Sequence, residues 1–128
     1  MQFVNIPSGY NQIMPYLILE NPELFFEFTK NVFDATEKMR HLHENGDLMH
    51  GEITIGNSCI MFGGAGGQWT PMTAGLFIYV DDVDKRFRKA QEAGGSVVME
   101  ISDREYGRTC GVKDPCGNTW WITTEPEK

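Results

Sequence analysis

Residues 14–33 read MPYLILENPELFFEFTKNVF and contain two different structural signals in succession. The apolar run 14–19 predicts a strand, and Pro15 stands at its start, where a missing backbone N–H is tolerated. Asn21 resembles a helix cap with Pro22 at the first helical position, and apolar side chains then recur at helical spacing. The stretch therefore predicts a strand followed by an amphipathic helix.

Three further strands are expected after this helix, over residues 36–43, 48–55 and 58–62. The first two are separated by Glu44-Asn45-Gly46-Asp47, whose Asn-Gly pair is typical of a tight hairpin. The glycine-rich segment 63–73 comes next and is expected to be a flexible connector. This connector divides the chain into two halves.

The second half repeats the order of the first. A strand is expected over residues 75–80, after which Asp81 or Asp82 caps a helix that ends at Gly94-Gly95. Three strands complete this half, over residues 96–101, 109–113 and 119–123.

A shift of 61 positions aligns the two halves without an insertion, placing Leu19 on Val80 and Gly56-Asn57 on Gly117-Asn118. This self-similarity predicts a duplicated module. The elements suit an α+β fold in which two tandem βαβββ modules form an eight-stranded open barrel-like sheet with the helices outside. We expect one domain, with module 1 at about 10–62, the linker at 63–73, module 2 at about 74–125, and a concave face left for a ligand.

Composition narrows the possible partners and the cellular location. The formal net charge of −7 argues against nucleic acid and against an anionic membrane surface. No apolar run reaches the roughly 20 residues that span a bilayer, and the first residues lack the pattern of a signal peptide. Three cysteines without a Cys-x-x-Cys motif favour a reducing, cytoplasmic location over a disulfide framework or a structural zinc site.

An ordered set of short motifs connects the two halves to a known family. In chain order they are PYL at 15–17, FFEFTKNVF at 25–33, MHGEI at 49–53, YVDDVD at 79–84, YGR at 106–108 and DPxGNxW at 114–120. This set resembles the PhnB-like branch of the vicinal-oxygen-chelate superfamily, the glyoxalase/bleomycin resistance protein/dioxygenase fold, over roughly residues 6–125. The resemblance implies paired βαβββ modules, an open barrel-like cavity and a homodimer. It leaves the chemistry open, because the superfamily spans isomerases, dioxygenases, thiol transferases and binding proteins.

Metal-dependent members of this superfamily carry His, Gln or Glu at four matched positions. Here those positions map to Met14, Ile60, Gly75 and Trp121, none of which offers a hard donor. The resemblance therefore implies a protein without a resident metal or other cofactor. It also puts metal-dependent isomerisation and extradiol dioxygenation in doubt, because both use the metal as an electrophile.

The three histidines offer an alternative metal site. If Asn45-Gly46 forms the hairpin tip, strand alternation puts His41, His43 and His50 on one face, with Glu52 two residues further along. Three imidazoles and a carboxylate could bind zinc or iron. The competing interpretation is a polar strand face, which we favour because a register slip of one residue reverses the faces.

His50 and Glu52 are also the candidate catalytic pair. Alternation puts them opposite Ile53 and Ile55, which belong under the helix, so that His50 and Glu52 point into the cavity. A histidine beside a carboxylate can act as an acid/base pair, and the alternative is simple cavity polarity or a salt bridge.

Several other side chains are candidates for ligand binding. Trp121 is expected to stack on a flat ligand, and Arg108 is expected to clamp a carboxylate or phosphate or, alternatively, to form a surface ion pair. Tyr16, Phe62 and Tyr79 add aromatic surface.

The function that these features favour is binding of a small aromatic or amphipathic molecule, with or without a metal-free reaction, by a homodimer. The alternative is a lyase or isomerase that uses His50 and Glu52, with or without a metal held by His41, His43 and His50. A third possibility is a module whose role is dimer assembly. The acidic net charge gives a weak preference for a cationic ligand.

Overall fold

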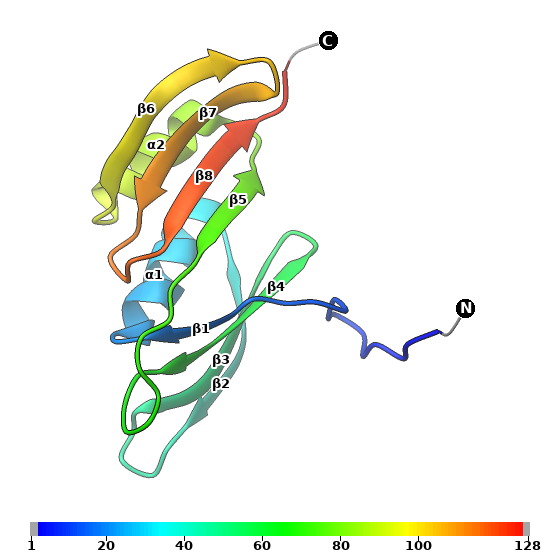
Figure 1. Cartoon of the computed structure of the whole chain (residues 1–128), viewed down its shortest axis with the longest axis vertical. Coiled ribbons are helices and arrows are strands. Elements are labelled where there is room, and N and C mark those ends of the chain that lie inside the picture. Colours follow the sequence, from blue (N-terminus) through cyan, green and yellow to red (C-terminus); the bar gives the residue numbers. More distant parts are fainter. Residues whose placement is uncertain (1–2, 127–128) are drawn as a thin grey trace.

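The computed structural model describes residues 3–126 as two four-stranded sheets and two helices (Figure 1). The elements are β1 (Tyr16–Leu19), α1 (Pro22–Phe33), β2 (Thr36–Leu42), β3 (Leu48–Ile55), β4 (Ser58–Gly64), β5 (Gly75–Tyr79), α2 (Val83–Glu92), β6 (Ser96–Arg104), β7 (Gly107–Lys113) and β8 (Thr119–Thr124). The predicted fold class is confirmed, because each half consists of a strand, a helix and three strands. Neither helix of the described chain is long and apolar enough to cross a membrane.

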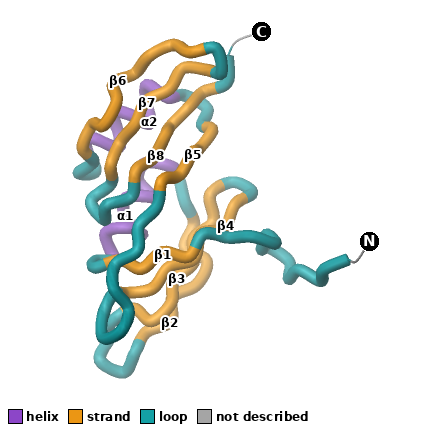
Figure 2. Tube along the Cα trace, viewed as in Figure 1, coloured by secondary structure: helices purple, strands orange, loops and turns teal. Residues whose placement is uncertain are grey.

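The two sheets have the same topology but remain separate. Their strand orders are β1-β4-β3-β2 and β5-β8-β7-β6. In each sheet the first strand pairs in parallel with the last strand of its module, and the remaining pairs are antiparallel. The sheets do not close into a barrel within one chain. Helix α1 contacts the first sheet, α2 contacts the second, and the two helices contact each other (Figure 2).

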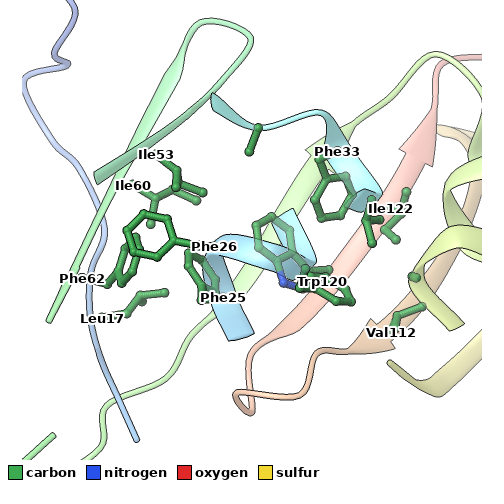
Figure 3. Packing of buried hydrophobic residues seen from close by; sticks show 14 of the residues in the cluster. Leu17, Phe25, Phe26, Phe33, Ile53, Ile60, Phe62, Val112, Trp120 and Ile122 are labelled. Atoms are coloured by element: carbon green, nitrogen blue, oxygen red, sulfur yellow. The ribbon is translucent and has the colours of Figure 1, made fainter. Parts of the chain in front are cut away.

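A single hydrophobic core joins the two halves through α1. The Phe25 ring lies 4.8 Å from the Phe62 ring of β4 and 6.3 Å from Trp120 of β8. Phe33, near the end of the helix, lies 4.7 Å from Trp120 (Figure 3). The helices pack on one face of each sheet, and neither described helix covers the opposite face; on the first sheet that face is contacted by Tyr10 from the segment before β1. We call these surfaces the first open face (β1–β4) and the second open face (β5–β8).

Strand pairing corrects one prediction about the repeat. Tyr16 pairs with Met61 in the first sheet, and Phe77 pairs with Trp121 in the second. The first strands therefore keep the shift of 61, but the last strands are related by 60, so Met61 and not Ile60 is the counterpart of Trp121. Ile60 instead packs in the core near α1 (Figure 3).

The difference in shift means that the second half is one residue shorter than the first between its paired first and last strands. The β3–β4 hairpin turns on two residues, since Ile55 pairs with Ser58. The β7–β8 connection is longer, since Lys113 pairs with Thr119. The assumption that no insertion separates the halves is therefore wrong. The second half has the longer last turn but is shorter before that turn, where α2 has 10 residues and α1 has 12.

The two helix caps differ. The Asp82 side chain accepts a hydrogen bond from the Lys85 N–H at 3.2 Å and caps α2, which decides between the two predicted aspartates. Asn21 precedes α1 but makes no hydrogen bond through its side chain. Pro22 at the first helical position therefore marks the start of α1 better than Asn21 does.

Candidate functional site

Four side chains form a continuous hydrogen-bonded chain on the first open face. The Tyr10 hydroxyl donates to Glu52 Oε1 at 2.6 Å, and Glu52 Oε2 lies 2.7 Å from His50 Nε2. The other ring nitrogen, His50 Nδ1, lies 3.1 Å from the Tyr16 hydroxyl. His50 and Glu52 share this face because they stand two residues apart on β3. Tyr16 is supplied by β1, and Tyr10 comes from the segment before β1.

The carboxylate of Glu52 is the electrostatic centre of this chain. Glu52 is only 3% exposed, and this burial raises the pKa of its carboxyl group. The hydrogen bonds from Tyr10 and His50 outweigh burial, so the net effect lowers the Glu52 pKa. The same hydrogen bond raises the pKa of Tyr10, which remains a phenol at neutral pH.

The ionised carboxylate also fixes the orientation of the imidazole. Glu52 can only accept hydrogen bonds, so a neutral His50 must carry its proton on Nε2. Nδ1 is then free to accept from the Tyr16 hydroxyl. The arrangement can take up a proton at His50 Nδ1 and stabilise the resulting imidazolium through Glu52.

A stability measurement tests the lowered pKa of Glu52. We expect Glu52→Gln to lower the free energy of unfolding at pH 7 by about 1 kcal/mol, because charge-assisted hydrogen bonds become neutral ones. A depressed native pKa stabilises the fold above the ordinary value of 4.5, and this contribution is lost as the pH falls through the native pKa. The difference between wild type and variant, measured by urea unfolding, should therefore shrink below pH 4.5. Glu44→Gln in the exposed β2–β3 turn is the matched control, and a pH-independent difference for Glu52→Gln would contradict the assignment.

Apolar surface lies beside the polar chain. Met61 of β4 stands between Tyr16 and Glu52 in the sheet. Together with residues before β1 it lines a cavity of about 330 Å³. The lining residues are Val4, Asn5, Ile6, Pro7, Tyr10, Asn11, Gln12, Met14 and Met61. A ligand at this position would meet a polar anchor on one side and carbon-rich side chains on the other.

The second open face carries an aromatic patch. Phe77 and Tyr79 of β5 have ring centroids 5.3 Å apart, and the Tyr106 ring lies 6.3 Å from Phe77. These residues are 51%, 64% and 50% exposed, respectively. Trp121 pairs with Phe77 on the neighbouring strand and rests over Gly111, where a side chain would collide with the indole. Two predicted ligand-binding residues, Tyr79 and Trp121, therefore lie together here.

Comparison with known proteins agrees with this architecture. The sequence profile of the Glyoxalase/Bleomycin resistance protein/Dioxygenase superfamily matches residues 10–122. The chain belongs to this superfamily. The uncharacterized protein Mb0911c of Mycobacterium bovis is 29% identical over an alignment of 120 residues that covers 84% of this chain and 79% of that protein.

Solved structures of other proteins share the superfamily fold. TioX from Micromonospora sp. ML1 aligns with a TM-score of 0.74 at 21% identity, covering 91% of this chain and 99% of TioX. A PhnB protein from Bacillus cereus aligns with a TM-score of 0.70 at 17% identity, covering 89% and 99%. The predicted resemblance is confirmed at the level of the superfamily, and a PhnB protein is among its structural neighbours.

Two candidate ligand-binding residues lie away from both open faces in this superfamily member. Phe62 is fully buried against Phe25 and Phe26 of α1. Arg108 Nε donates to Asp84 Oδ1 at 2.8 Å, and its Nη1 donates to Asp103 at 3.1 Å. Its guanidinium is therefore occupied by two carboxylates of the same chain.

The donor sets for a metal ion are incomplete. Within residues 3–126, no three His, Cys, Asp or Glu side chains lie close enough together to hold a metal ion. His41 pairs with His50 across β2 and β3, but the predicted His41, His43 and His50 set is not assembled. The side chains where first and last strands pair on the open faces are Tyr16, Met61, Phe77 and Trp121. These residues do not fit the imidazole and carboxylate site that metal-dependent superfamily members require.

Proposed function

We propose that this chain binds a small aromatic or amphipathic molecule on the first open face, without a metal ion, in a cavity completed by a second copy. The observation that carries the proposal is the hydrogen-bonded chain from Tyr10 to Tyr16 beside Met61. A polar cluster that is satisfied by hydrogen bonds, has a buried carboxylate at its centre and lies beside apolar side chains is the usual arrangement of a small-molecule site.

The polar cluster determines how a ligand would be anchored. Glu52 is ionised and accepts hydrogen bonds only, so the ligand group nearest to it must be a donor. Tyr16 is 47% exposed and has a hydroxyl that can donate or accept. The site therefore favours a ligand with a flat or apolar body and at least one hydrogen-bond donor.

The exposed aromatic patch supports a homodimer. Phe77, Tyr79 and Tyr106 form a contiguous exposed aromatic patch, and patches of this kind often mark interaction sites. Placing the second open face of one copy over the first open face of another would bury these rings and complete a closed cavity. In that arrangement Trp121 of the partner would stack on a ligand that is anchored by Glu52 and His50.

A second candidate function is acid–base catalysis on the bound molecule. The 2.7 Å contact between His50 Nε2 and Glu52 favours it, because a carboxylate in this position orients the imidazole for proton transfer. A lyase or isomerase reaction would then use His50 as the proton acceptor. Recovery of the ligand unchanged after long incubation would favour binding alone, and a mass or isomer change would favour catalysis.

The binding proposal is tested by thermal unfolding with a panel of small aromatic compounds. A ligand at about 100 times its Kd should raise Tm by on the order of 10 °C for a chain of this size. We expect His50→Ala to abolish this rise, whereas His43→Ala, at the exposed end of the β2–β3 hairpin, should keep it. Sedimentation should give the mass of two chains, and elemental analysis should find no stoichiometric metal. A monomer, or an equal loss of ligand binding in both histidine variants, would refute the proposal.

A further inference from the structure

Tyr10 contacts the site from outside the sheets. Its hydroxyl donates to Glu52 Oε1 at 2.6 Å, although the two residues are 42 positions apart in the chain. The Lys38 ammonium lies 3.6 Å from the centre of the Tyr10 ring and also donates to the Gly9 carbonyl at 2.6 Å. The phenol is thus held at its polar end by a carboxylate and over its face by a cation, as a bound aromatic ligand would be.

The segment that carries Tyr10 is weakly attached. Residues 3–15 contain no charged side chain and form no helix or strand. Phe3 and Ile13 are 89% and 88% exposed, so they bury little apolar surface. Besides the contacts of Tyr10 and Lys38, two hydrogen bonds connect the segment to β4: one of 3.4 Å from the Cys59 N–H to Asn11 Oδ1 and, at the end of the segment, one of 3.0 Å from the Met61 N–H to the Pro15 carbonyl. A segment with few buried apolar contacts can detach locally at a small cost in free energy.

We infer that Tyr10 is an internal occupant of a subsite for hydroxyaromatic ligands, and that a phenol-type ligand binds by displacing it. This inference rests on the proposed function, since it names the chemical class of ligand for the same site. The subsite consists of Glu52 as acceptor, the Lys38 ammonium over the ring, and Met61 in the adjoining cavity of about 330 Å³. Most residues that line that cavity belong to the same segment as Tyr10, so departure of Tyr10 opens the cavity and leaves Met61 and Glu52 accessible to the incoming ring.

The chemistry of the subsite selects the form of the ligand. A neutral phenol supplies the O–H that Glu52 accepts, whereas a phenolate would place a second negative charge against the carboxylate. The raised pKa of Tyr10 agrees with this preference for the protonated form. His50 contacts the other oxygen of Glu52, so its ring signals report which donor occupies the subsite.

The test replaces the internal phenol with a free one. In Tyr10→Ala, p-cresol, which is the tyrosine side chain as a free molecule, should shift the His50 ring resonances in NMR titrations. Toluene lacks the hydroxyl and should bind at least about tenfold more weakly, because a hydrogen bond to a charged acceptor is lost. Wild type should bind p-cresol at least about tenfold more weakly than Tyr10→Ala, because Tyr10 competes for the subsite. Adding Glu52→Gln to Tyr10→Ala should remove most of the preference for p-cresol over toluene.

Controls keep the result interpretable. Ser8→Ala changes an exposed residue of the same segment and should behave as wild type. Tyr10 lies outside the core, so circular dichroism and Tm should show that Tyr10→Ala remains folded.

Two results would overturn the inference. Folded Tyr10→Ala would fail to bind p-cresol up to the solubility limit of p-cresol, or it would bind p-cresol and toluene equally. The proposed function is tested separately by the panel of small aromatic compounds. If those compounds bind wild type and lose binding in His50→Ala, the proposed function stands even when the Tyr10→Ala test fails. The converse result is that p-cresol binds Tyr10→Ala while no compound of the panel binds wild type. That result would refute the proposed function and leave the inference about Tyr10 intact.

Discussion

Replacing Trp120 with alanine should lower the free energy of unfolding by about 3–5 kcal/mol, the usual cost of removing a buried tryptophan. Trp120 is 1% exposed, and its indole packs against Phe33 and Phe25 of α1. Because α1 belongs to the first half and Trp120 to the second, the cavity left by the substitution would open where the two halves meet. Urea unfolding followed by circular dichroism measures the loss.

Trp69→Ala is the matched control. Trp69 lies in the connector between the halves and is 59% exposed, so its removal should change the stability by less than about 1 kcal/mol. The shape of the unfolding curve gives a second readout, since weaker coupling through α1 should let the two modules unfold at different urea concentrations. Equal losses in the two tryptophan variants would contradict the shared core.

Local chemistry in the sequence predicts most of the fold. The Asn45-Gly46 pair gives the β2–β3 hairpin, and Gly46 takes the positive φ of 92° that such a turn requires. The bounds of β3 match the prediction at both ends, because its apolar and polar residues alternate between well-defined turns. By contrast, β6 continues to Arg104 and contains two register irregularities. Residues 102–104, by which β6 exceeds the predicted strand, are all polar, so they lack the alternation of apolar and polar residues that predicts a strand.

Alignment of the repeat with one constant shift fails because the two halves differ in length between their first and last strands. The shift of 61 compares Ile60 with Trp121, but Ile60 lies in the core and Trp121 on the second open face. In a strand a one-residue offset moves a side chain to the opposite face. Phe62 was expected to bind ligand but lies fully buried against α1. It directly follows Met61 in β4, so its side chain points to the helix side of the sheet and not to the first open face.

The candidate site is only partly readable from the sequence. Alternation along β3 suffices to put His50 and Glu52 on one face, and the aromatic strand start suggests Tyr16. Tyr10 carries no comparable signal, because it lies in a segment without periodicity and reaches Glu52 only through tertiary structure. Arg108 was a ligand-binding candidate in the sequence, but its guanidinium is paired with Asp84. This pairing depends on how α2 packs beside β7, which the local sequence does not show. Long-range contacts of this kind are set by the assembled fold and not by local spacing.

The turn before β8 gives the second large expected effect. Asp114→Ala should lower the free energy of unfolding by about 2–4 kcal/mol, because buried donors lose their acceptor. The Asp114 carboxylate is nearly buried and accepts from the Cys116 N–H at 2.9 Å and from Trp120 Nε1 at 2.8 Å. It also accepts from the backbone N–H and side-chain amide of Asn118, each at 3.0 Å. Asn118 in turn accepts from the Ala74 N–H, so the loss should extend to the chain just before β5.

A double-mutant cycle separates this network from a general weakness of the turn. Trp120→Phe removes the indole donor, so Asp114→Ala should cost less in that background than in wild type. Asp103→Ala is the control, because Asp103 is an exposed partner of Arg108 and surface ion pairs contribute little, about 0–1 kcal/mol. Strictly additive losses for Asp114 and Trp120 would show that the indole hydrogen bond contributes nothing. Coupling between them would mean that the turn holds Trp120 in its core position, and with it the neighbouring Trp121 on the second open face.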